Sequence, residues 1–269
     1  MKQPVTGIII MLFASCGFTA CNYFVHADTT KNTTFVSNAT VSATENTNPE
    51  PLPEPPQLEP VYPPLLITPT EQAIINAGLT DVKTMDSSIV IDLKYSTTDN
   101  FLGMDVYGDF NKCYLQPDVA EKLKCAQHCL KEKFPYYNLI VYDAARPRSV
   151  QRIMWDTVDI PYIERSKYLS SPTGGSLHNF GAAVDISIID ENGYVLDMGT
   201  PYDYFGELAY PREEERMIRE GKLTYKQLLN RELLRSVMQQ AGFWGITTEW
   251  WHFNSCSRDK AYEKYTILE

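Results

Sequence analysis

Two stretches of the chain carry apolar residues at helical spacing, over residues 117–133 and 225–241. The apolar positions are Val119, Leu123, Ala126 and Leu130 in the first stretch, and Leu228, Leu229, Leu233, Val237 and Ala241 in the second. Because positions three or four apart share one face of an α-helix, each stretch predicts an amphipathic helix. Gly242 directly follows the second stretch, and glycine is favoured where a helix ends. A third, shorter helix is expected over residues 149–158.

Four other stretches have the pattern of β-strands. Residues 88–95 and 138–142 are largely apolar runs, residues 183–189 alternate, and residues 243–253 are rich in aromatic side chains. The dipeptide Asn192-Gly193 predicts a tight turn, after which residues 194–196 are expected to return as the second arm of a hairpin. Together these elements predict an α+β domain with a mainly antiparallel central sheet and flanking helices, rather than a doubly wound parallel sheet.

The first residues have the pattern of an export signal. Lys2 precedes an apolar run over residues 7–16, which is too short to predict a membrane span. Residues 18–21 (Phe-Thr-Ala-Cys) are similar to a bacterial lipoprotein box, with Phe18 in place of the usual leucine, whereas residues 25–27 (Val-His-Ala) are similar to an ordinary signal-peptidase site. We favour a signal peptide of the lipoprotein type over residues 1–27, with lipidation at Cys21, and plain signal cleavage is the alternative.

Residues 28–64 have the composition of a linker. Thr, Asn, Ser, Glu and Pro dominate the segment, and eight prolines lie between Pro49 and Pro64. Apolar periodicity is missing, so the segment has too little apolar surface to fold, and proline-rich chains of this kind are extended and stiff. The sequence therefore predicts a disordered tether between the N-terminal anchor and a catalytic domain over residues 65–269.

The chain is acidic, with a formal net charge of −10 and a pI of about 5.0. Proteins that bind nucleic acid neutralise phosphates with basic residues, so nucleic acid is not an expected partner. Contact with a membrane is expected only through the N-terminal lipid anchor, and the sequence does not indicate an oligomeric state. Export predicts a cell-envelope location, where disulfides form. Cys113, Cys125, Cys129 and Cys256 are expected either to form two bridges, in one of three pairings, or to stay partly free.

Two of the four histidines stand in segments that have the pattern of a metal site. His178 precedes a glycine-containing turn and the predicted strand that carries Asp185. A carboxylate in an otherwise apolar strand needs a cation, and a metal ion shared with His178 would provide one. His252 supplies a second imidazole. Two histidines and one aspartate, with the fourth position open, are a typical ligand set of one catalytic Zn²⁺ ion.

Two further residues have the chemistry that a zinc hydrolase requires. Glu249 lies three residues before His252, and a fourth protein ligand would close the metal site, so Glu249 is interpreted as the base that takes a proton from a zinc-activated water. Positions three apart on a regular strand face opposite sides, so the chain must bend or bulge near Trp251. Arg146 belongs to the segment 144–148 that follows the predicted strand 138–142, where its cation can stabilise charge that develops on a scissile carbonyl.

These residues fall in a two-part pattern that resembles the zinc D-Ala-D-Ala peptidases. The first part is Ser176-x-His178-x-x-Gly181-x-Ala183-x-Asp185, and the second is Glu249-x-x-His252. Three further segments resemble the D-alanyl-D-alanine dipeptidase branch rather than the carboxypeptidase branch, and the likeness spans about residues 80–260. These segments are residues 95–103 (Tyr-Ser-Thr-Thr-Asp-Asn-Phe-Leu-Gly), 142–147 (Tyr-Asp-Ala-Ala-Arg-Pro) and 198–203 (Met-Gly-Thr-Pro-Tyr-Asp).

The resemblance implies a role for each matching position. His178, Asp185 and His252 match the zinc ligands, Glu249 matches the catalytic base, and Arg146 matches the arginine that stabilises the tetrahedral oxyanion. Substrate contacts are implied at three more positions. Asp203 matches an acidic residue that receives the free amino group of a dipeptide, and Tyr95 and Ser176 match residues that line the same small pocket. Leu177 differs from the polar side chain that relatives often carry before the first histidine, a change that can alter amine recognition.

The pattern predicts hydrolysis of D-alanyl-D-alanine, or of a similar short D-amino-acid dipeptide, with a role in cell-wall peptide metabolism. Branch members linked to glycopeptide resistance act in the cytoplasm, so the export signal of this chain argues against a resistance role. One alternative is an envelope D,D- or L,D-carboxypeptidase that trims peptidoglycan stem peptides. The second is a peptidoglycan-binding module that keeps the metal without catalysis, for which Glu249 and Arg146 together would have no chemical need.

Overall fold

The computed structural model describes residues 67–269, so the predicted signal peptide (1–27) and linker (28–64) lie outside the described residues. The longest helices in this part are α3 (Pro117–Lys133) and α7 (Tyr225–Gln240), as the sequence predicts. The predicted short helix is also present, as α4 (Arg148–Thr157). The other helices are α1 (Pro69–Asn76), α2 (Val82–Met85), α5 (Tyr162–Arg165), α6 (Glu214–Arg219) and α8 (Arg258–Lys264). None of the helices within 67–269 has the length and apolar character needed to cross a bilayer.

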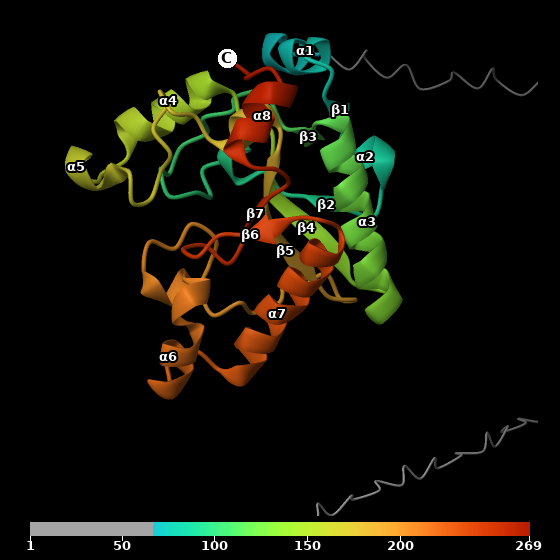
Figure 1. The fold of residues 1–269 in the computed structure, drawn as a ribbon, viewed down its shortest axis with the longest axis vertical. Helices are drawn as coiled ribbons and strands as arrows, with labels where there is room; N and C mark the ends of the chain where they lie inside the picture. The colour runs from blue at the N-terminus through green and yellow to red at the C-terminus, as the bar shows by residue number, and fades with distance from the viewer. Residues whose placement is uncertain (1–66) are drawn as a thin grey trace, which may run out of the picture. The chain divides into compact units, whose positions relative to one another are not determined.

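The strands of the described part form two sheets (Figure 1). The smaller one pairs β1 (Thr80–Asp81) with β3 (Tyr114–Leu115). The central sheet has the order β2-β4-β5-β7-β6, built from β2 (Val90–Ile91), β4 (Asn138–Asp143), β5 (Ala183–Ile189), β7 (His252–Asn254) and β6 (Trp244–Gly245). The pair β2–β4 is parallel, whereas β4–β5, β5–β7 and β6–β7 are antiparallel. The fold is therefore α+β, around a mixed sheet.

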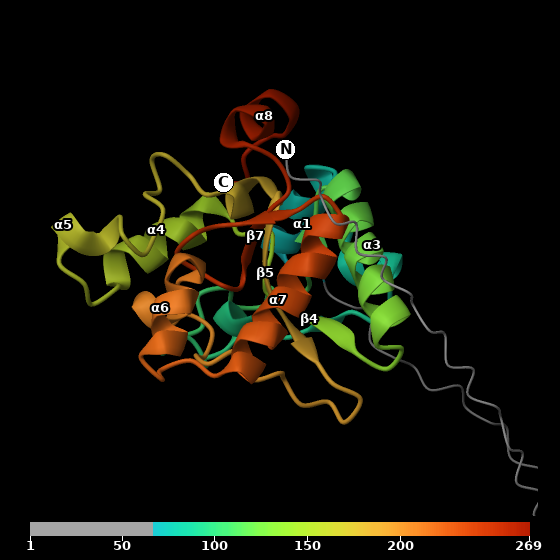
Figure 2. The ribbon, with the colours of Figure 1, turned by 60° about the horizontal axis from the view of Figure 1, so that its bottom comes forward.

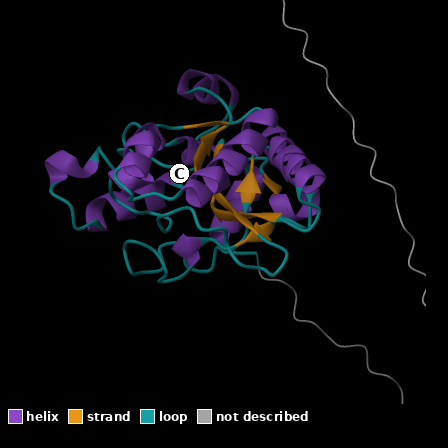
Figure 3. Ribbon diagram, turned by 90° about the horizontal axis from the view of Figure 1, so that it is seen from below, coloured by secondary structure: helices purple, strands orange, loops and turns teal. Residues whose placement is uncertain are grey.

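One face of the central sheet is covered by α3 and α7, which lie side by side against it (Figures 2 and 3). Val184, Ile186 and Ile188 of β5 are buried in the same core as the apolar stripes of these two helices. Side chains alternate across a strand, so Asp185 lies on the opposite face. The two helices thus cover one face of the sheet, and the functional site lies on the opposite face, with Asp185.

Two predicted strands end earlier than their composition indicates. The segment 88–95 is paired only at β2, after which the chain turns into the short 3-10 helix η1 (Lys94–Ser96). This turn buries the ring of Tyr95 on the functional face, which a continued edge strand would not do. The predicted hairpin turn is present at Gly193 (φ +81°), but the second arm makes only a single bridge, Ile189 to Val195.

The prediction of one strand over 243–253 is wrong, because the segment is two short antiparallel strands joined by a loop. β6 and β7 pair Trp244 with Asn254 and Gly245 with Phe253, and residues 246–251 form the connection. The adjacent side chains of Trp250 and Trp251 are both buried, which a regular strand at a sheet surface does not allow. The chain therefore reverses direction between β6 and β7, and Glu249 lies in the connecting loop.

The four cysteines of the described part are all free thiols. Cys113 is buried in the core, Cys125 is exposed on α3, and Cys129 and Cys256 are partly buried. The sequence left open two bridges, in one of three pairings, or partly free cysteines. In this structure none of the four cysteines is bridged.

Candidate metal centre and active site

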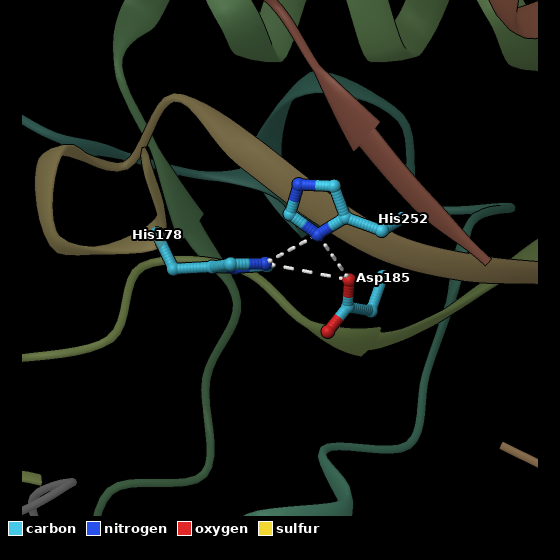
Figure 4. A group of neighbouring side chains, drawn as sticks. All are labelled: His178, Asp185 and His252. Atoms are coloured by element: carbon cyan, nitrogen blue, oxygen red, sulfur yellow. Dashed lines mark hydrogen bonds and ion pairs between the residues drawn. The ribbon is translucent and has the colours of Figure 1, made fainter. Parts of the chain in front are cut away.

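Three side chains that are far apart in the sequence converge on the face of the sheet opposite α3 and α7 (Figure 4). His178 Nε2 lies 3.2 Å from His252 Nδ1 and 3.3 Å from Asp185 Oδ1, and His252 Nδ1 lies 2.9 Å from the same oxygen. The three ligand atoms thus lie within 4.8 Å of one another, and they form a group that can hold one metal ion. The structure therefore brings together the three residues that the sequence analysis assigned to the metal.

The two imidazoles are held by hydrogen bonds on their far sides. His178 Nδ1 lies 2.8 Å from the carbonyl oxygen of Ala144, and His252 Nε2 lies 2.9 Å from Asn254 Oδ1. Each of these oxygens accepts a hydrogen bond from its ring nitrogen, so the other nitrogen of each ring faces the cluster and can bind a metal ion. Partners of this kind fix the tautomer and orientation of metal-binding histidines.

Local backbone structure places each ligand. Asp185 lies opposite His252 in the antiparallel register of β5 and β7, and Asn254 points to the same side as His252 because it lies two residues further along the strand. His178 comes from the 3-10 helix η2 (Leu177–Phe180), which ends at Gly181 in the left-handed region (φ +63°). A Cβ atom at Gly181 would lie 2.7 Å from Leu79 Cδ2, so the turn into β5 requires glycine for both conformation and space.

Asp185 uses both carboxylate oxygens. Oδ1 faces the two histidines, and Oδ2 accepts a hydrogen bond from the Tyr202 hydroxyl at 2.9 Å. Burial alone would raise the pKa of Asp185, but the neighbouring His178 and His252 hold it well below its usual range. Burial likewise lowers the pKa of His252, yet its hydrogen bond to Asp185 raises that pKa to about 9. Asp185 is thus a carboxylate that the two histidines stabilise.

Arg146 lies beside this cluster within a buried hydrogen-bond network. Its Nε donates to Asp143 Oδ2 at 2.8 Å, its Nη1 donates to Gln151 Oε1 at 2.8 Å, and its guanidinium stacks 5.1 Å above the ring of Tyr95. Its Nη2 also lies 3.8 Å from Asp185 Oδ2. A guanidinium held by fixed partners in this way presents its remaining donors in one direction, as stabilisation of a developing negative charge requires.

Glu249 lies in the loop between β6 and β7, and its Oε2 is 3.9 Å from His252 Nδ1. Its side chain is 26% exposed, so it borders the cavity and is not sealed in the core. Burial raises the pKa of Glu249, and the charge of Asp185 adds to this effect. A carboxylate close to the metal cluster with a raised pKa suits a group that takes up and releases a proton.

Asp203 and Tyr95 form an acidic end of the same cavity. The Tyr95 hydroxyl lies 3.0 Å from Asp203 Oδ2 and 3.2 Å from the hydroxyl of Tyr202. Burial and the nearby charge of Asp185 raise the pKa of Asp203 well above its usual value. Asp203 also adopts φ +58°, and it is the sole non-glycine residue with positive φ in the part of the chain described. Strained backbone of this kind is often retained at a ligand site.

A cavity of about 440 Å³ connects these groups. It is lined by all three members of the metal cluster, by Glu249, Arg146, Tyr95 and Asp203, and by Ser176. The Ser176 hydroxyl also accepts from the backbone N–H of His178 at 3.4 Å, so it caps η2 as well as facing the cavity. All eight residues that the sequence analysis singled out therefore lie around one cavity.

Four supporting residues were missed by the sequence analysis, although they hold its candidates in place. Asp143 and Gln151 fix Arg146, Tyr202 fixes Asp185, and Asn254 fixes His252. The position of Asn254 two residues after His252 indicates a shared strand face and could have identified it. An aspartate at the end of an apolar strand was a comparable signal for Asp143, whereas only the tertiary contacts identify Tyr202 and Gln151.

The donor set fits a zinc ion. Two imidazole nitrogens with fixed tautomers and one carboxylate oxygen are the ligand types that zinc prefers, and three protein ligands leave one position open. The acidic side chains of Asp143, Asp185, Asp203 and Glu249 surround Arg146, so a bound divalent cation would also offset the negative charge of the site.

Comparison with known proteins gives the same answer as the geometry. A family model described as D-ala-D-ala dipeptidase matches residues 75–267. A D-alanyl-D-alanine dipeptidase of Escherichia coli (strain K12) is 32% identical over 181 residues, which cover 65% of this chain and 83% of the relative. The dipeptidase of Enterococcus faecium is 29% identical over 186 residues, covering 64% and 87%, and that of Synechocystis is 28% identical over 168 residues, covering 52% and 68%.

A buried cluster of two histidines and one aspartate, beside a glutamate and an arginine in one cavity, is the arrangement of a metallopeptidase with a single metal site. The match over residues 75–267 makes the assignment more specific: the chain belongs to the D-Ala-D-Ala dipeptidase family.

Proposed function

We propose that the protein hydrolyses D-alanyl-D-alanine or a similarly short D-amino-acid dipeptide, with one zinc ion held by His178, Asp185 and His252. The observation that carries this proposal is that the metal cluster and the acidic pair Asp203–Tyr95 share one cavity. A free dipeptide has an ammonium group close to its only peptide bond, so a carboxylate near the reaction centre selects it.

When bound, zinc supplies Lewis acidity, which polarises the scissile carbonyl and lowers the pKa of water to about 7. Glu249 removes a proton from the attacking water and passes it to the leaving amine nitrogen. Its distance of 3.9 Å from His252 Nδ1 and its raised pKa support both halves of this transfer, because the same group must first accept the proton and then release it.

Arg146 stabilises the negative charge that develops on the carbonyl oxygen. Its guanidinium is anchored on Asp143 and Gln151, so it does not have to reorganise when the charge appears. Asp203 and Tyr95 receive the ammonium group of the substrate, and the buried ammonium and carboxylate then compensate each other. Ser176 lines the cavity next to His178 and contacts the substrate there.

An envelope location is part of this proposal. The export signal and tether predicted over residues 1–64 would hold the enzyme outside the cytoplasmic membrane as a lipoprotein, where it would degrade short peptides released from peptidoglycan. Labelling of cells with a lipid precursor, compared between the natural chain and a Cys21→Ser variant, tests the anchor. Label in the natural chain alone supports lipidation at Cys21, and label in neither chain contradicts it.

Release of D-alanine from two substrates tests the reaction. The purified chain is stripped of metal, titrated with zinc, and given either free D-Ala-D-Ala or a wall pentapeptide that ends in D-Ala-D-Ala. We expect rapid release from the dipeptide, with activity saturating near one zinc per chain. Faster release from the pentapeptide would indicate the carboxypeptidase alternative. Zinc binding without release from either substrate would indicate a non-catalytic binding module.

A further inference from the structure

Arg258 is an exposed cation that lines the cavity, and neither the metal cluster nor the proposed amine site uses it. It begins α8 and lines the cavity together with the metal cluster. Its Nη2 donates to the carbonyl oxygen of Gly175 at 2.9 Å, and a Cβ atom at Gly174 would lie 3.4 Å from its Nη1. The guanidinium therefore rests on a backbone segment that glycines keep open, directly before Ser176.

The other two cations that line the cavity already have carboxylate partners. Arg146 is paired with Asp143, and Lys167 lies 3.5 Å from Glu164. For Arg258, no ion pair is formed with any residue of the described part, and its one hydrogen bond goes to a neutral carbonyl. A guanidinium carries five donors, so most of its capacity to bind an oxyanion is still available.

Arg258 and Asp203 line the same cavity but are linked to different members of the metal cluster. Asp203 is linked through Tyr95 and Tyr202 to Oδ2 of Asp185, the oxygen that faces away from the histidines. Arg258 is linked through Gly175 to the segment that caps η2 and carries His178.

We propose that Arg258 binds the C-terminal carboxylate of the substrate and thereby selects peptides whose scissile bond is the last one. This inference rests on the proposed function, because it takes the ammonium group to be at Asp203 and the peptide bond at the metal cluster. A dipeptide held at these two points directs its carboxylate away from Asp203, and among the described residues Arg258 is the arginine lining the cavity that has no carboxylate partner. Guanidinium and carboxylate match in shape and charge, and they form a charge-assisted, bidentate pair.

Kinetics with a charged and an uncharged C-terminus test the proposal. The zinc-loaded full chain, Arg258→Gln and Arg258→Lys are given D-Ala-D-Ala and its C-terminal amide. We expect Arg258→Gln to raise KM for the free acid by about 10-fold with little change in kcat, because one charge-assisted contact at a partly solvated site is lost. The natural chain and Arg258→Gln should cleave the amide equally well. For the free acid, the KM of Arg258→Lys should lie between those of the natural chain and Arg258→Gln, because lysine keeps the positive charge but cannot form the bidentate pair.

Lys260→Gln is the matched control, since it removes a positive charge two residues away on the same helix at a position that does not line the cavity. It should leave both substrates unaffected. If Arg258→Gln slowed the acid and the amide by the same factor, or changed neither, the carboxylate assignment would be wrong.

A binding measurement separates this proposal from the proposed reaction. Calorimetry with a zinc-loaded Glu249→Ala chain measures the affinity for acid and amide without turnover, alone and combined with Arg258→Gln. A preference for the acid that disappears with Arg258→Gln supports the inference even if the natural chain hydrolyses neither compound. Hydrolysis of the dipeptide with an unchanged preference for the acid overturns the inference and leaves the reaction intact, and absence of any dipeptide binding overturns both.

Discussion

Asp185 on β5 lies directly opposite His252 on β7, and its Oδ1 is 2.9 Å from His252 Nδ1. Across the other edge of β5, Asp143 of β4 is paired with Asp185 at a bulge in the ladder. Three strands thus place two carboxylates and an imidazole in one row. The row is stable because each charge has its own partner: Arg146 binds Asp143, and the histidines bind Asp185. A bound metal ion would take over the second of these roles.

Replacement of Glu249 by glutamine should remove catalysis and leave the metal in place. Glutamine has almost the same shape but cannot take up a proton, so kcat should fall by about 10²–10⁴-fold while KM changes little. His178→Ala is the comparison, because it removes a ligand atom and should lose zinc itself. Metal content and steady-state rates of both variants check this pair, and near-normal turnover in Glu249→Gln would exclude Glu249 as the base.

Removal of the Asn254 side chain should weaken metal binding, although Asn254 is not itself a metal ligand. Asn254 Oδ1 accepts a hydrogen bond from His252 Nε2 and holds Nδ1 toward the cluster. Loss of such a partner lowers metal affinity by about 10–100-fold. Competition with a fluorescent zinc chelator measures the effect in Asn254→Ala. Asn192→Ala, in an exposed turn, serves as the control and should bind zinc as the natural chain does.

Asp203→Asn should lose selectivity for a free amino group. An amide keeps the volume of the side chain but provides no negative charge to balance a buried ammonium, so KM for D-Ala-D-Ala should rise by about 10–100-fold. N-acetyl-D-Ala-D-Ala, which has no ammonium, should be affected much less. The measurement compares kcat/KM for both compounds, and equal losses on the two would rule out an amine-binding role.

The same aspartate should make dipeptide binding sensitive to acid. Burial and the charge of Asp185 raise the pKa of Asp203, so in the free enzyme its carboxylate becomes protonated at a higher pH than an ordinary aspartate does. Protonation removes the charge that pairs with ammonium, so kcat/KM should fall as the pH is lowered through this raised pKa. The corresponding step should be missing from the pH profile of Asp203→Asn.

Gly181→Ala should destabilise the fold and displace His178. A residue with a Cβ atom is strained at φ +63°, and the new atom would lie 2.7 Å from Leu79 Cδ2, so the free energy of unfolding should fall by about 2–4 kcal/mol. Gly193→Ala shares the positive φ (+81°) but has open space around it, and the loss there should be only about 1 kcal/mol. Chemical unfolding of both variants compares them, and equal losses would contradict the steric part of the explanation.

The elements that were predictable are those whose signal is local. The helices α3 and α7 and the strand β5 follow from residue spacing, and the structure confirms these three elements. The predicted apolar stripe of α3 is buried, whereas on α7 the predicted Leu229 is exposed and Leu234 and Met238 are buried instead. The bend that the sequence analysis required near Trp251 is present as the loop between β6 and β7. The length of this loop was not predictable from sequence. It depends on the burial of Trp250 and Trp251 in the core, and the order of residues in a short aromatic run does not indicate which side chains are buried.

The candidate residues of the site were identifiable from sequence for a different reason. Histidines are few in this chain, and their spacing from Asp185 and Glu249 resembles that of the zinc D-Ala-D-Ala peptidases, so the sequence favours a metal-dependent hydrolysis. The sequence by itself therefore determined the ligand types, the long helices and the α+β class. Only the tertiary structure decided the mixed sheet, the partners that orient each ligand, and the place of Arg258 in the cavity. These depend on contacts between segments far apart in the chain, which local spacing does not encode.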